Sequence, residues 1–191
     1  MGTQASVAEV VATVFTVVVG CTSFSGSIIT FLKLQELMTT RPVVFPGGRF
    51  VIAATLAGVL ATAGWTISSG GNTPLLIMAA LSLAFGVLFV LPVGGADVPI
   101  VISLLNAFTG LTVAASGYVL QATLLIVAGT LVGASGTILT RLMAEAMGRS
   151  LFGTLFGAFT AKPQATTGTA DRKSTRLNSS HMSESRMPSS A

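Results

Sequence analysis

Charged residues are scarce in this sequence. Only 8% of its 191 residues are Asp, Glu, Lys or Arg, whereas soluble domains carry about 25% charged residues. Between Arg49 and Arg141 the single charged residue is Asp97. This shortage of charge excludes a soluble globular domain, and a hydrophobic share of 51% points to a protein that lies within a membrane.

Cysteine and histidine are also scarce, and with other missing patterns this excludes further kinds of protein and site. The single cysteine, Cys21, excludes an internal disulfide. The single histidine, His181, lies in a polar tail, and we assign it no metal or proton role. The net charge of +4 comes without a basic face interleaved with aromatics, so we expect no nucleic-acid binding. The first apolar segment lacks the basic start and the shortness of a cleavable signal peptide. No dinucleotide fingerprint is present, and we expect no bound metal or cofactor.

The apolar segments are long enough for five membrane crossings, each of which needs roughly 20 residues. We therefore predict an all-α integral membrane protein, a bundle of about five transmembrane helices within a domain at 1–159. Lys33 and Glu36 are expected to mark the exit of the first helix into water, and Arg41–Pro42 to end it. The predicted helices span about 6–37, 50–67, 75–90, 98–120 and 123–147.

The stretch GGADVPIVISLLNAFTG, residues 94–110, is the most informative part of the chain. Asp97 is expected to cap the helix that follows, and Pro99 suits its first turn. Asn106 lies at membrane depth, where an amide needs a partner because hydrocarbon offers none. Asn106 either bonds a neighbouring helix or holds a water path. Its predicted helix face is small and polar and consists of Ser103, Asn106, Gly110, Ala114 and Gly117.

Two other helices carry small or polar faces. The first helix has a stripe of hydroxyl and small residues at Thr13, Thr16, Gly20, Ser23, Ser27 and Thr30. The fifth has a glycine face at Gly129, Gly133, Gly136 and Thr140, which predicts close helix packing. If both polar faces meet this glycine face, they line a narrow wettable seam. The third helix, in contrast, is expected to face lipid. Glu145 and Arg149, four apart, are expected to form an exposed pair.

The chain changes character after the fifth helix. Residues 160–170 have the composition of a flexible linker. Residues 171–191 contain DRKSTRLNSSH and SRMPSS, which resemble the translation of a sequencing-library adapter, and we expect this tail to be adapter-derived and disordered. The basic loops at Lys33–Arg49 and Arg141–Arg149 are separated by four helices, so the positive-inside rule predicts that both face the cytoplasm or matrix.

Four segments together resemble the membrane domain of proton-translocating NAD(P) transhydrogenase, in its beta (C-terminal) part. They are SFSGSIITFLKL, the stretch at 94–110, LLIVAGTLVGASGTIL and AMGRS. The resemblance covers roughly residues 5–160. It implies an enzyme that couples hydride transfer from NADH to NADP⁺ to proton translocation across the bacterial or mitochondrial inner membrane. A self-contained five-helix transporter or channel, or a structural membrane scaffold, remains the alternative.

The resemblance also implies roles for individual residues. Asn106, with Ser103 beside it, matches the proton path, and Asp97 and Arg149 match residues that face the NADP-binding domain. The helix-packing glycines are Gly110, Gly129, Gly133 and Gly136. The implied partners are lipid, further transhydrogenase helices and the NAD(H)- and NADP(H)-binding domains, in a homodimer. The family's proton-carrying histidine would precede Met1 and its NADP-binding domain would follow the linker, so we expect a fragment that transfers no hydride alone.

Overall fold

The computed structural model describes residues 6–39, 41–43, 47–69, 71–150 and 153. These residues form five helices, all long and apolar enough to cross a membrane, which confirms the predicted all-α bundle. A one-turn helix, η1 (Gly95–Asp97), precedes the fourth. The predicted linker (160–170) and tail (171–191) lie outside the described residues. The helices are α1 (Val7–Leu34), α2 (Gly48–Ser69), α3 (Asn72–Val90), α4 (Val98–Val119) and α5 (Thr123–Ala146).

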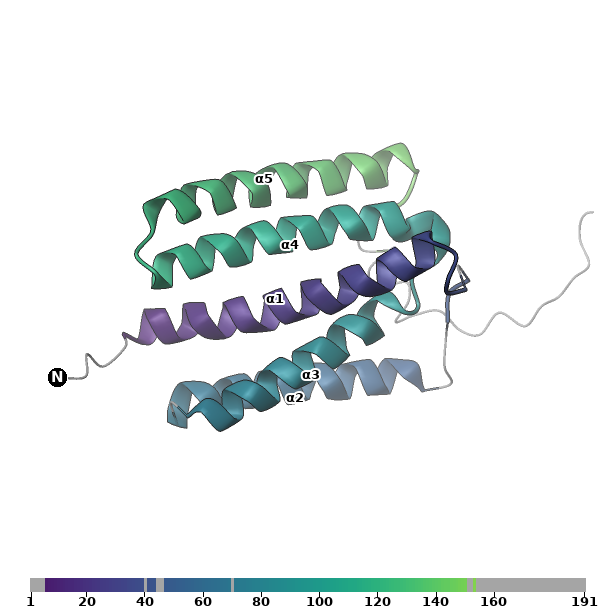
Figure 1. The fold of residues 1–191 in the computed structure, drawn as a ribbon. Helices are drawn as coiled ribbons and strands as arrows, with labels where there is room; N and C mark the ends of the chain where they lie inside the picture. Colours follow the sequence, from purple (N-terminus) through teal and green to yellow (C-terminus); the bar gives the residue numbers. More distant parts are fainter. Residues whose placement is uncertain (1–5, 40, 44–46, 70, 151–152, 154–191) are drawn as a thin grey trace, which may run out of the picture. The chain divides into compact units, whose positions relative to one another are not determined.

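The helices pack in an order that differs from their order in the chain. Helix α4 lies between α1 and α5, while α3 packs on α1 and α2 packs mainly on α3 (Figure 1). Successive helices run in opposite directions, so the last turns of α1, α3 and α5 lie at one end of the bundle (Figure 1). We call this the charged end. It carries Lys33, Glu36, Arg41, Arg49, Asp97, Arg141, Glu145 and Arg149.

Helix α3, which its composition predicted to face lipid, has one face packed inside the bundle, while Leu76 and Ile77 on its other side are exposed. Ser82 and Met78 are fully buried. A Cβ atom added at Gly86 would collide with the Thr22 backbone and the Ser25 hydroxyl of α1. Small residues let two helix backbones approach closely, and this close packing replaces the hydrophobic driving force that is missing between helices in lipid. One face of α3 is therefore an interior surface of the bundle.

Helix α1 ends earlier and differently from its prediction. It begins with a capping box, in which Ser6 and Glu9 bond each other's backbone N–H groups. It ends at Leu34, because Glu36 adopts a left-handed conformation (φ 56°) and donates its N–H to the Lys33 carbonyl. Arg41–Pro42 therefore does not end the helix. Lys33, which was expected to mark the exit into water, is only 1% exposed.

Candidate functional site

The interface between α4 and α5 is closed by backbone contact. A Cβ atom added to any of the glycines at this interface would meet backbone atoms of the facing helix, except at Gly133, where it would meet a leucine side chain. The facing pairs are Gly110 with Gly133, Ala114 with Gly129, and Ala107 with Gly136. Helix α4 itself covers the glycine face of α5 and separates it from α1, so this face takes no part in the predicted seam.

Ser103 belongs to this closed interface. It is 5% exposed, and its hydroxyl is joined to the Thr140 hydroxyl of α5 by a hydrogen bond of 3.1 Å. Thr140 also donates to the carbonyl of Gly136 at 2.7 Å. Both hydroxyls are thus satisfied between the two helices. They hold α4 and α5 in register close to the charged end.

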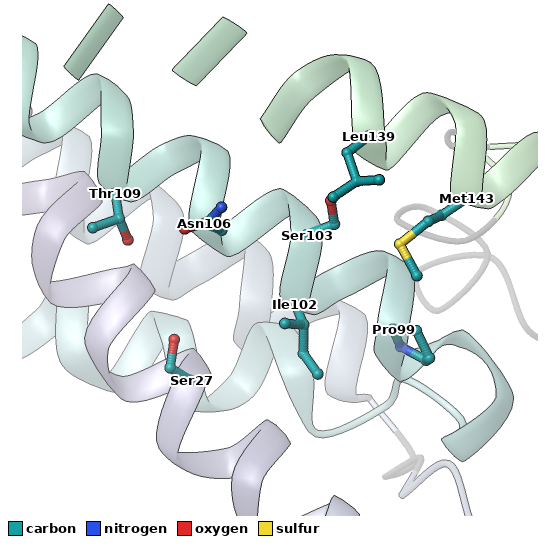
Figure 2. Close-up of a pocket in the computed structure, with 8 residues that line it drawn as sticks. All are labelled: Ser27, Pro99, Ile102, Ser103, Asn106, Thr109, Leu139 and Met143. Atoms are coloured by element: carbon teal, nitrogen blue, oxygen red, sulfur yellow. The ribbon is translucent and has the colours of Figure 1, made fainter. Parts of the chain in front are cut away.

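A groove opens beside this interface, along the flank of α4. It has a volume of about 480 Å³ and is bordered by Ser27 of α1 and by Leu139 and Met143 of α5. Figure 2 shows the Ser27 side chain pointing from α1 towards the stretch of α4 that carries Asn106. We call it the Asn106 groove. Its lining from α4 consists of Pro99, Ile102, Ser103, Asn106 and Thr109.

Asn106 points into the groove rather than into a helix contact (Figure 2). It is exposed, and among the described residues it makes no hydrogen bond. Of the two alternatives left open by the sequence, a hydrogen bond to a neighbouring helix is not found within the described part of the chain. An amide offers two donors and an acceptor. All of them are available to water or to a polar group that occupies the groove.

Asp97 and Arg149 meet at the charged end. The Arg149 Nε lies 3.4 Å from the Asp97 Oδ1, and the two side chains are 55% and 17% exposed. The predicted side-chain cap of α4 by Asp97 is wrong, since Asp97 makes no capping hydrogen bond. Its backbone is helical (φ −94°, ψ −5°) because it ends η1. A capping side chain needs an extended backbone to reach the next N–H groups.

The end of α5 explains how Arg149 reaches Asp97. Gly148 adopts a left-handed conformation (φ 63°), and the Arg149 N–H donates to the Ala144 carbonyl at 2.9 Å. This is the usual glycine-based helix end. It takes Arg149 off the helix, so the predicted helical pair with Glu145 is wrong. An exposed ion pair contributes only about 0–1 kcal/mol. The contact with Asp97 therefore fixes geometry more than it stabilises the fold.

The sequence placed Asn106 and Ser103 on one helix face, and the family resemblance pointed to Asp97 and Arg149. The structure places Asn106 and Ser103 on one groove and joins Asp97 to Arg149. Sequence reasoning did not single out the remaining groove residues on α4 and α5. Only Thr109 could have been found from helical spacing, because it follows Asn106 by three positions and therefore lies on the same face of the helix. The other residues missed are Ile102, Leu139 and Met143.

The described residues do not fit a nicotinamide cofactor or a metal. They form helices only and contain no strand–turn–helix phosphate site of the kind that binds dinucleotides. Within the same residues, no cluster of three or more His, Cys, Asp or Glu side chains is present. We therefore assign no step of hydride transfer to the residues described.

Comparisons with known proteins identify the family. The family model described as NAD(P) transhydrogenase beta subunit matches residues 1–189. Two relatives from Rhodospirillum rubrum, one of them from a designated strain, are both named NAD(P) transhydrogenase subunit beta. Each is 39% identical over 141 residues, which is 74% of this chain. The chain spans about 30% of the length of these relatives. With its five apolar helices, the chain belongs to the NAD(P) transhydrogenase beta subunit family, as part of a membrane domain.

Proposed function

We propose that the five helices form part of the proton-translocating membrane domain of a transhydrogenase that couples hydride transfer from NADH to NADP⁺ to proton passage. Family membership and the five apolar helices support this proposal over a self-contained channel or a scaffold. The complete enzyme, a homodimer in this proposal, would supply the NAD(H)- and NADP(H)-binding domains and further helices. It would lie in a bacterial or mitochondrial inner membrane.

The orientation in the membrane is part of the proposal. Arg41, Arg49, Arg141 and Arg149 all lie at the charged end, whereas Glu9 is the only charged residue that the structure describes near the opposite end. The positive-inside rule places Lys- and Arg-rich loops in the cytoplasm or matrix. We therefore assign the charged end, and the C-terminus beyond it, to that side.

Asn106 carries the proposal for the proton path. The supporting observation is that its amide faces a groove of about 480 Å³ without a hydrogen-bond partner among the described residues. An amide donates and accepts simultaneously and does not titrate. It is suited to hold a chain of water or to orient a proton carrier, with Ser103 on the same groove wall. The competing interpretation is a packing hydrogen bond to a further helix, worth about 0.6 kcal/mol.

The test compares Asn106→Leu with wild type in the complete enzyme, reconstituted in sealed vesicles. We expect proton pumping to fall steeply while NADP(H) still binds and the enzyme remains assembled. The matched control is Thr130→Val, which alters a hydroxyl on the exposed face of α5 that bonds only its own helix backbone. Normal pumping by Asn106→Leu would reduce this residue to a packing role.

We propose that Asp97 and Arg149 couple these helices to the NADP-binding domain. The support is their ion pair of 3.4 Å at the charged end. Arg149 also immediately precedes the segment that leads to the predicted linker. A shift of that segment would act directly on a carboxylate two residues before Pro99, at the start of the helix that carries Asn106. Coupling would thus pass along α4 from Asp97 towards the groove.

A further inference from the structure

Lys33 is a buried cation that the functions proposed above do not use. It lies in the last turn of α1 and is 1% exposed. One turn earlier, Ile29 belongs to an apolar cluster with Val90, Val93 and Leu105. No carboxylate pairs with Lys33 within the described part of the chain. Burying an unpaired charge is costly unless hydrogen bonds compensate for the lost water, so its partners are informative.

The partners of Lys33 are three backbone carbonyls at the end of α3. Its Nζ donates to the carbonyl oxygens of Val90 (3.1 Å), Leu91 (2.6 Å) and Val93 (2.8 Å). The last carbonyls of a helix lack partners within that helix and carry partial negative charge. An ammonium has three donors. All three are used here, which excludes Lys33 as a free anion-binding group and makes it a clamp on the end of α3.

The clamped carbonyls begin the turn that ends at Asp97. The Val93 N–H donates to the Val90 carbonyl at 3.1 Å, and the Asp97 N–H donates to the Gly94 carbonyl at 2.9 Å. The same turn receives a longer bond of 3.4 Å, from the Val43 N–H to the Leu91 carbonyl. Among the described residues, Lys33 therefore supplies three of the four hydrogen bonds that join residues 90–93 to the chain before α3.

We propose that Lys33 is a positioning residue that ties the α3–α4 turn to α1 and thereby places Asp97 against Arg149. Only Gly94, Gly95 and Ala96 separate Val93 from Asp97, so we expect a turn released at Val93 to loosen the position of the Asp97 carboxylate. This arrangement makes the Asp97–Arg149 contact depend on α1, a helix that contributes no atom to it. Lys33 would position Asp97 in this way whether or not the ion pair serves coupling.

The test measures the proximity of positions 97 and 149 in the full chain, reconstituted in liposomes with Cys21→Ser. Asp97→Cys and Arg149→Cys are joined by a short bis-methanethiosulfonate, and the initial rate of cross-linking is recorded. Lys33→Met removes all three hydrogen bonds, and we expect it to slow this reaction at least about tenfold, the factor that corresponds to losing a single hydrogen bond to a charged group. We expect Lys33→Arg to keep most of the rate because it keeps the charge and the donors.

A second pair of introduced cysteines distinguishes local positioning by Lys33 from misfolding of the whole chain. Ser103→Cys and Thr140→Cys lie across the α4–α5 interface, where the native hydroxyls are 3.1 Å apart. Slower cross-linking at 97–149 with an unchanged rate at 103–140 supports the proposal. An unchanged 97–149 rate in Lys33→Met overturns it. If Lys33→Met slows the cross-linking of both cysteine pairs, the same rates are measured in Lys33→Gln. A rate that falls only for the 97–149 pair in Lys33→Gln supports positioning. Any other pattern shows that Lys33 acts only in folding.

Discussion

Two glycines one turn apart on α5 predict opposite responses to the same substitution. A Cβ atom at Gly129 would collide with the Ala114 backbone nitrogen and would lie 2.7 Å from the Gly110 carbonyl oxygen. At Gly133 the nearest atoms belong to the Leu111 side chain, at 3.1 and 3.3 Å. Backbone atoms move only if the helices separate, whereas a leucine side chain changes its rotamer. Gly129→Ala should therefore destabilise the protein, and Gly133→Ala should be tolerated.

The magnitude follows from two opposing effects. Replacing glycine by alanine within a helix gains about 1 kcal/mol from helix propensity, and both variants share this gain. Overpacking a close interface costs about 1–3 kcal/mol, and only Gly129→Ala bears this cost in full. The difference in the free energy of unfolding between the two variants is therefore about 1–3 kcal/mol, since the shared propensity gain cancels.

The assay is reversible unfolding of the full chain in mixed micelles with increasing sodium dodecyl sulfate, followed by far-ultraviolet circular dichroism. Gly133→Ala serves as the matched control because it has the same chemistry on the same helix. Equal stability of the two variants would refute the argument, since it would mean that α4 and α5 are not in backbone contact at Gly129. Greater destabilisation by Gly133→Ala would refute it as well.

Three further predictions concern the membrane, the tail and the cofactor. With Cys21→Ser, the variants Glu36→Cys and Ser69→Cys should react with an impermeant thiol reagent from opposite sides of a sealed membrane, because α2 separates them; reaction from one side would contradict the topology. We also propose that residues 171–191 are adapter-derived. The family match extends to residue 189 and so includes this tail, which makes the DNA sequence the decisive test. Codons unlike the adapter, or a homologous genomic locus that encodes the same tail, would disprove the proposal. The purified chain should bind neither NAD(H) nor NADP(H) in calorimetric titration, and micromolar binding of either would contradict the prediction.

The sequence alone predicted the number and type of the helices, and it singled out Asn106 and Ser103 as candidates for the site. Helix formation in a membrane is local, because each span must satisfy its backbone hydrogen bonds within itself and bury about 20 apolar residues. The close face of α5 is also local information, since Gly129, Gly133 and Gly136 recur at helical spacing. The amide of Asn106 stood out because polar groups are rare at membrane depth.

Only the tertiary structure decided which of these groups meet. The hydrogen bonds of Lys33 join residues 57 to 60 positions apart, which no local pattern reveals. The sequence around Lys33 instead indicated a cation at the exit of the helix into water. Asp97 looked like a helix cap until η1 gave it a helical backbone and Gly148 turned Arg149 towards it. Periodicity shows which residues share a face of one helix. Which helix covers that face depends on the packing of all five, and that packing left Asn106 on an open groove.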